Sequence, residues 1–282
     1  HSGVETGAFR LGQSFWPEEH LRTGFPADLI GKWTVWGLPE THWRARGNGC
    51  RLEESFYGAS FRSTGDEGGD FILVDGYNGD GRNPYHCFAT VDLRLGGFTL
   101  LEGYRNQVWT LTDGLAEPAI PRDAALRSSN VIGRTAVFVG EVPRAPFSRW
   151  RRSIALRTGK YALFVDDLAY RTGGECRDVQ VLWEPAPSLR SSVAAPGMLR
   201  LETGGSPESE PGRSSFDICL SDPLETMSSG KGTYVMRSLG PARAGQRDIY
   251  FSVCAPGPAD SRENPACGRV AWNAAALALP EP

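Results

Sequence analysis

Apolar and polar residues alternate with a period of two along much of this chain, which is the pattern of β-strands with one buried face. Residues 91–95, with the sequence VDLRL, follow this pattern, and residues 98–101, FTLL, form the expected partner strand. Gly96-Gly97 suits the two-residue turn between them, because glycine tolerates the positive φ angles that such turns need. The stretch 75–113 is therefore expected to build a hairpin with an apolar middle and with polar and aromatic groups at its ends.

Further strands are expected at short intervals, separated by turns rich in glycine, proline and polar residues. They cover residues 32–36, 56–62, 70–74, 130–131, 135–139, 150–156, 161–167, 179–183, 198–202, 216–220, 234–238 and 248–253. Helical periodicity is scarce, and the longest stretch that suits a helix is residues 269–279. The pattern predicts an all-β fold, built as a large antiparallel β-sandwich with few or no helices.

The first 48 residues differ from the rest of the chain, because tryptophans stand there among glycines and charges. Such a segment cannot form a core of its own, yet its tryptophans are too large and apolar to be left in water. We expect residues 1–48 to form an extended strap packed on the main domain, and we favour core packing over sugar stacking for the tryptophans. Residues 49–282 are expected to form one β-sandwich domain.

Charge and hydropathy indicate which kinds of partner this protein is not expected to have. The chain has 30 basic and 33 acidic side chains and a net charge of -3. This balance does not favour nucleic acid, whose binding proteins carry a concentrated basic surface. No stretch approaches the roughly 18 consecutive apolar residues of a membrane span, so none is expected.

The six cysteines lack CxxC spacing, so a zinc ribbon is not expected. An even number permits disulfides and favours an exported protein, in the periplasm, at the cell surface or secreted. Half-buried free thiols fit the sequence equally well. One pairing, Cys254 with Cys267, would close the proline-rich loop between them.

Four stretches, taken in order, resemble the C-terminal β-sandwich region of the heparinase II/III-like polysaccharide lyases. The third of them has an arginine-bearing strand, a short turn and a strand that ends in aspartate. Together they extend from about residue 52 to about residue 256, which is most of the chain. The four stretches are residues 59–63 with 70–73, residues 83–86 leading to 101–104, residues 151–154 with 161–167, and residues 249–253.

The resemblance implies a stacked, supersandwich-like arrangement of sheets that normally follows a helical toroid. Those enzymes cleave uronic-acid polysaccharides by β-elimination, in which a tyrosine or histidine base removes the proton next to the carboxylate. Asn, Arg or His groups neutralise the acid. On this basis Tyr85 and His86 are the candidate catalytic residues. The toroid residues of the family have no counterparts in this sequence.

Hairpin geometry adds candidate substrate-binding residues. With a Gly96-Gly97 turn, position 193 minus i lies opposite position i, so His86 is expected opposite Gln107. Tyr85 and His86 would then share one end of the ladder with a polar and aromatic group, at distances that cross-strand side chains bridge. An arginine there can form a two-pronged hydrogen bond with a uronate. The members of this group are Glu102, Tyr104, Arg105 and Asn106.

The sequence departs from the family where a metal would bind. The family often shows His-x-His at this hairpin, one histidine being a structural zinc ligand, whereas this chain has Pro84-Tyr85-His86. Glu102 approximates the acidic metal ligand, but the further histidine is missing because His86 is the last histidine in the sequence. Structural zinc requires four protein ligands. We therefore expect no metal and no cofactor.

Two charged groups have competing interpretations. Asp166 and Asp167 could suggest paired catalytic carboxylates, but neighbouring strand residues point to opposite faces, so a strand end followed by a turn is favoured. Arg149, Arg151 and Arg152 could meet an acidic glycan, although a solvated strand face is the favoured interpretation.

Three functions remain open at this point, and whether the chain is an enzyme is open with them. The first is a heparinase II/III-like sandwich that acts on or binds acidic polysaccharide and is not catalytic as an isolated chain. The second is an active lyase completed by a helical toroid domain or a partner chain. The third is a structural or assembly module of an exported protein.

Overall fold

The computed structural model describes residues 29–46, 50–66, 68–77, 87–112, 123–145, 147–171, 173–195, 197–203, 214–221, 224–226 and 232–257. No helix in these ranges is long and apolar enough to cross a membrane. The predicted all-β fold is confirmed, since the elements within these described ranges are strands apart from one short helix. In chain order they are β1 Trp33–Gly37, α3 Glu40–Arg46, β2 Ser55–Arg62, β3 Phe71–Asp75, β4 Thr90–Leu95, β5 Phe98–Glu102, β6 Val108–Thr112, β7 Ala124–Ile132, β8 Thr135–Val142, β9 Ser148–Arg157, β10 Tyr161–Tyr170, β11 Gly174–Trp183, β12 Leu189–Ala195, β13 Met198–Thr203, β14 Ser215–Leu220, β15 Leu224–Thr226, β16 Tyr234–Ala242 and β17 Arg247–Pro256.

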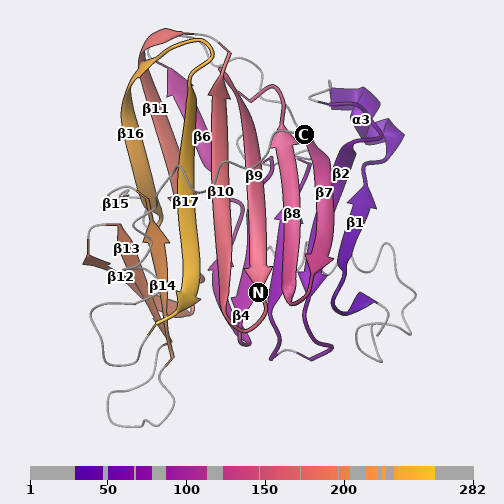
Figure 1. Ribbon diagram of the computed structural model, residues 1–282, viewed down its shortest axis with the longest axis vertical. Helices are drawn as coiled ribbons and strands as arrows, with labels where there is room; N and C mark the ends of the chain where they lie inside the picture. Colours follow the sequence, from indigo (N-terminus) through magenta and orange to yellow (C-terminus); the bar gives the residue numbers. More distant parts are fainter. Residues whose placement is uncertain are drawn as a thin grey trace.

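Within the described chain the strands form two antiparallel sheets. The larger has 13 strands in the order β12-β13-β14-β17-β10-β9-β8-β7-β2-β3-β4-β5, with β1 beside β2, and the smaller has the order β15-β16-β11-β6. In Figure 1, β4 lies behind β9 and β10, whereas β11 and β16 of the smaller sheet lie to the left of β10. A bridge between Leu101 and Pro185 links β5 to the segment that follows β11. The two layers make the predicted sandwich.

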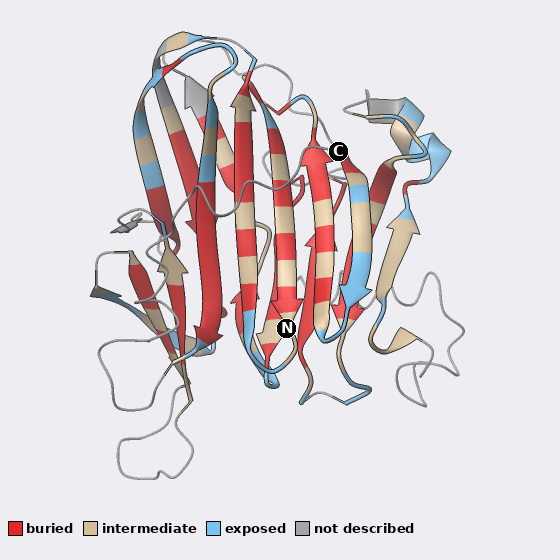
Figure 2. Ribbon diagram, viewed as in Figure 1, coloured by how far each residue is buried: buried red, intermediate tan, exposed pale blue. Residues whose placement is uncertain are grey.

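The core lies between these layers and follows from the alternation seen in the sequence. Buried and partly exposed residues alternate along β8, β9 and β10 (Figure 2). In β9 every second residue from Ser148 to Leu156 is buried. Phe164 of β10 meets Trp183 of β11, with 5.0 Å between ring centroids. The second layer is thus packed directly on β10.

An ion pair with no exposure to solvent lies in this core. Arg152 of β9 and Asp166 of β10 face each other in register and are 0% exposed. Nε and Nη2 of the arginine donate to the two carboxylate oxygens at 2.7 and 2.9 Å. Trp150 Nε1 donates to the same carboxylate at 2.9 Å. The favoured interpretation of Arg152 as part of a solvated face was therefore wrong, because strand parity turns it inward with Trp150.

The neighbouring charged residues point outward. Asp167 pairs with Arg247 of β17, with 2.6 Å between Nε and Oδ1. Arg151 lies 3.5 Å from Glu141 of β8. The expectation that Asp166 and Asp167 occupy opposite faces is confirmed, but both lie inside β10 rather than at its end.

The strand expected at residues 32–36 is present as β1, which pairs with β2. The ring of Trp33 lies 5.0 Å from that of Phe138, and Trp33 packs against the main core. Helix α3 was not predicted. The division of the chain at residue 48 stays a prediction, and the helix expected at 269–279 lies outside the described residues.

The cysteines do not follow the suggested pairing. Cys254 is a free thiol with 0% exposure, so a Cys254–Cys267 disulfide is wrong. Cys50 and Cys87 are also free. Cys219 is disulfide-bonded, with a partner outside the described side chains.

Breaking the buried pair should be far more costly than breaking an exposed one. Arg152→Met should lower the free energy of unfolding by about 3–5 kcal/mol, because it leaves a buried carboxylate without its partner. The double variant with Asp166→Leu should lose less than the sum of the single changes. Arg44→Met, at an ion pair with Glu40 whose side chains are 73% and 54% exposed, is the control and should cost about 1 kcal/mol or less. Chemical denaturation of the wild type, the two single variants, the double variant and the control measures these costs, and a cost below 1 kcal/mol for Arg152→Met would contradict this account.

Candidate functional site

The predicted hairpin is formed by β4 and β5, and its register is as expected near the turn. Leu95 pairs with Phe98 and Arg94 with Thr99. Beyond these pairs the register shifts by one residue, so Glu102 faces Asp92 instead of Val91. Such a β-bulge sharpens the local twist and changes where side chains point.

The ladder also ends earlier than predicted. β4 begins at Thr90, and Cys87 and Phe88 form a turn in which Phe88 has a φ of 64°. The expected extension of the strand through residues 87–89 is therefore wrong. Tyr85 and His86 lie outside the described residues, so their catalytic roles stay predictions.

The described residues on either side of the segment 78–86 lie close together. Tyr77 forms an isolated bridge with Asp123, and the Cys87 thiol lies 3.9 Å from the carbonyl of Gly76. Asp75 at the end of β3 donates its backbone N–H to Ala89 at 2.9 Å. Both ends of the loop therefore lie at the end of the sheet where β4 starts and β5 stops.

Three of the predicted substrate-binding residues are half-buried at this same end. Glu102 closes β5, and Tyr104 and Arg105 lie in the turn that follows. Tyr104 packs against a small apolar cluster that includes Phe71 and Val91. Each of the three keeps part of its surface accessible, so each can be reached by a ligand at this end of the hairpin.

Asn106 is different, because it is 0% exposed. Its side-chain oxygen accepts the N–H of Glu184 at 2.6 Å, and its side-chain nitrogen donates to Gly103 at 3.2 Å. Its backbone carbonyl accepts Nη1 of Arg152 at 2.8 Å. These contacts fix the turn that carries Tyr104. A direct contact between Asn106 and substrate stays a prediction.

An aromatic group that sequence reasoning missed stands beside the loop. His42 of α3 stacks on Tyr77, with 5.6 Å between ring centroids and 26° between planes. Tyr57 of β2 lies 5.6 Å from Tyr77 and 6.4 Å from His42. His42 is exposed, whereas Tyr77 is buried. The sequence signal was the position of Tyr77 directly before a turn-rich loop.

Two thiols near the loop are not reactive nucleophiles. The Cys50 thiol donates to Asp123 Oδ2 at 3.0 Å, and burial together with this hydrogen bond raises the pKa of the thiol well above its ordinary value. Burial, and then the charges of Asp75 and Asp123, raise the pKa of the Cys87 thiol. Thiolate is the nucleophilic form, so neither cysteine supplies it at neutral pH.

Asp92 is the buried carboxylate closest in the ladder to Glu102. Burial raises the pKa of Asp92, and the guanidinium of Arg94 opposes that shift. Arg94 Nη2 donates to Asp92 Oδ2 at 2.8 Å. The guanidinium therefore offsets part of the cost of burying this carboxylate.

The described side chains include no group of three or more His, Cys, Asp or Glu residues arranged to hold a metal ion. Glu102 is described, and its sequence-predicted partner His86 is not. What this end of the sandwich offers chemically is therefore a set of aromatic faces, a guanidinium and carboxylates.

Comparison with solved structures shows which known proteins share this two-layer antiparallel arrangement. The chain matches the heparan sulfate lyase from Pedobacter heparinus with a TM-score of 0.55 and 14% identity, over 76% of this chain and 37% of that chain. It matches a heparinase III with a TM-score of 0.53 and 14% identity, over 87% of this chain and 39% of that one.

The fold of the heparinases is thus confirmed for this chain, which spans less than two fifths of the length of these proteins. Another structure of heparinase III matches with a TM-score of 0.52 and 12% identity, over 74% of this chain and 37% of that chain. No protein-family model matches the sequence, and no curated protein does. At these identities the comparison establishes the fold.

Removing the guanidinium beside Asp92 should have a pH-dependent cost. Arg94→Ala should raise the pKa of Asp92 further and lower the free energy of unfolding by about 2 kcal/mol at pH 7. The loss should shrink as the pH falls below the pKa of Asp92, because a protonated carboxyl needs no guanidinium. Denaturant unfolding at several pH values tests this, with Arg190→Ala on exposed β12 as the control. A loss that does not vary with pH would contradict it.

The chain should hold no stoichiometric zinc. Of the positions that match the metal ligands of the family, only His86 and Glu102 carry ligand side chains, and structural zinc requires four. Elemental analysis after dialysis should find well under one zinc per chain, and a value of about one would refute this.

Proposed function

We propose that this chain is a heparinase II/III-like β-sandwich domain that binds acidic, uronic-acid polysaccharide and is not catalytic as an isolated chain. The observation that carries the proposal is the half-buried Arg105 beside Tyr104, at the sheet end where His42, Tyr57 and Tyr77 also gather. The shared fold supports it, since one matched protein is named for an acidic polysaccharide, heparan sulfate.

The chemistry of this end suits such a ligand. A guanidinium forms two parallel hydrogen bonds with a carboxylate, an arrangement that a lysine cannot reproduce. Aromatic rings offer flat apolar faces on which a sugar ring can stack. Asn106, buried beneath the turn, would orient Tyr104 and Arg105 rather than bond to the ligand.

The second candidate function is an active lyase completed by a helical toroid domain or a partner chain. Tyr85 or His86 would then remove the proton next to the uronate, while Arg105 neutralises the carboxylate. Pro84 in place of the first histidine of the family motif favours binding without catalysis. A structural or assembly role is the remaining alternative. The lyase activity, the structural or assembly role and export from the cell are all proposals.

Replacing Arg105 should weaken binding of a uronate polymer without disturbing the fold. Arg105→Ala should lose about 1.5–3 kcal/mol of binding free energy, the contribution of one charge-assisted hydrogen-bonded contact, and its unfolding curve should be unchanged. Arg134→Ala, an exposed arginine in the β7–β8 turn, is the matched control and should bind normally. Calorimetric titration with heparin and with alginate oligomers measures these affinities.

The same protein preparations distinguish binding from catalysis. The release of ultraviolet-absorbing unsaturated ends from these polymers should be undetectable for the chain alone. Release that is lost in His86→Ala would instead establish the lyase. Unchanged affinity in both Arg105→Ala and His86→Ala would rule out this end of the sandwich as the polysaccharide site.

A further inference from the structure

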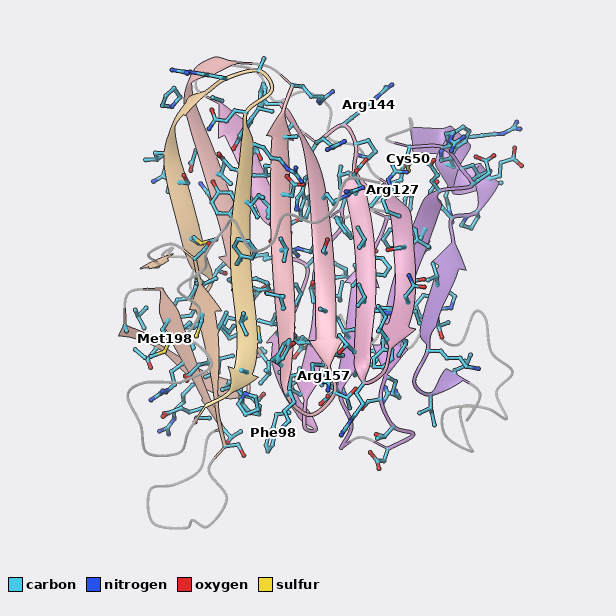
Figure 3. All side chains as sticks on the ribbon, in the orientation of Figure 1. Cys50, Phe98, Arg127, Arg144, Arg157 and Met198 are labelled. Carbon is cyan, nitrogen blue, oxygen red and sulfur yellow. The ribbon has the colours of Figure 1, made fainter. Side chains whose placement is uncertain are left out.

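A cavity of about 280 Å³ lies at the opposite end of the β4–β5 hairpin from Tyr104 and Arg105. The Gly96 turn and the β9–β10 turn form part of its wall, and residues at the facing ends of β14 and β17 complete it. Phe98, which lines it, is at the far end of the molecule from Cys50 (Figure 3). The cavity is therefore separate from the site proposed above.

The mouth of the cavity is held by Asp70, whose side chain is buried. Its Oδ1 accepts the N–H of Gly96 at 2.8 Å, and its Oδ2 accepts the N–H of Gly159 at 2.5 Å. One carboxylate therefore ties two turns together from two different hairpins. A cavity between turns fixed in this way is preorganised, so a ligand need not order its walls.

One wall of the cavity is aromatic. Phe98 is 36% exposed although it is large and apolar, and its ring lies 5.4 Å from that of buried Phe216. Pro256 adds a further apolar surface. A partly exposed aromatic face over an apolar floor is suited to stacking against the flat face of a sugar ring.

The polar groups of the cavity favour an anion with hydroxyl groups. Lys160, in the β9–β10 turn, is the cationic side chain among the lining residues, whereas both oxygens of Asp70 already accept backbone N–H groups. The hydroxyl oxygen of Ser215 is buried and has no hydrogen-bond partner among the described residues. A buried hydroxyl without a partner is unfavourable, and rotation of the serine side chain toward the cavity would let a ligand hydroxyl satisfy it.

We propose that this cavity binds a single acidic sugar unit, a hexuronate, as a second carbohydrate subsite; the choice of a uronate rests on the proposed function. The volume lies just below the roughly 300–1,000 Å³ of sites for drug-sized ligands, which suits one sugar ring rather than an oligomer. Phe98 stacks on the ring, Lys160 pairs with the carboxylate and Ser215 bonds to a hydroxyl. Glu102 lies four positions after Phe98 in β5, about 13 Å along a strand, so one sugar cannot occupy both sites.

Titration of the full chain with D-glucuronate, in the Arg105→Ala background so that the other proposed uronate site is silent, followed by ligand-observed NMR, tests this subsite. D-glucuronate should bind in the millimolar range and about tenfold tighter than D-glucose, because only the uronate pairs with Lys160. Lys160→Gln should remove that preference, and Phe98→Ala should weaken both sugars about tenfold. Lys32→Gln and Ile132→Ala change an exposed cation and an exposed apolar residue that do not line the cavity, and they should bind normally.

Three results would overturn the subsite: equal binding of the two sugars, glucuronate binding unchanged in Lys160→Gln, or benzoate binding as tightly as glucuronate. Lys160 lies in an exposed turn, so Lys160→Gln keeps the test valid even if Phe98→Ala fails to fold. Arg105→Ala should leave glucuronate binding to the cavity unchanged. If Arg105→Ala loses polymer binding but binds glucuronate normally, the two sites are separate. If the unmodified chain binds glucuronate but no polymer, the cavity proposal stands and the proposed function is refuted.

Discussion

The buried pair of Arg152 and Asp166 is the interaction on which the two-layer arrangement depends. A guanidinium that is shielded from solvent is stable only where its N–H groups have hydrogen-bond acceptors and its positive charge has a negative partner. Asp166 accepts two of its hydrogen bonds and the carbonyl of Asn106 accepts a third. The faces of Trp150 and Trp183 lie 5.1 and 5.6 Å from the guanidinium carbon. These partners come from both layers, so the pair requires the layers to meet.

The same pair sets the geometry of the candidate polysaccharide site. Arg152 holds the backbone of Asn106, and Asn106 in turn accepts the N–H of Glu184 beyond the end of β11. The turn that carries Tyr104 and Arg105 is thereby attached to the core and to the second sheet. A binding surface placed on such a support keeps its side chains in fixed positions, which suits recognition of a planar carboxylate.

The sequence predicts the strands well because alternation records which face of each strand is buried. Two further features of the sequence indicate the inward position of Arg152 and the register shift between β4 and β5. Trp150, Arg152 and Ile154 share one parity in β9, which places Arg152 inside, and the consecutive buried residues Leu100 and Leu101 break the alternation where the register shifts. The group of His42 with Tyr57 and Tyr77 left no comparable signal, because its members come from separate elements that only the folded chain brings together.

Two charged side chains fix the β4–β5 hairpin, one at each end. Asp70 binds the N–H groups of Gly96 and Gly159 and so joins its turn to the β9–β10 turn, while Arg152 of β9 binds Asn106 just beyond its other end. Both contacts attach the β4–β5 hairpin to the same neighbour, the β9–β10 hairpin. A strand pair held at both ends cannot slide by one residue without breaking a charged contact. The separation between the residues at its two ends is therefore a fixed property of the fold, and any ligand that uses both ends must span it.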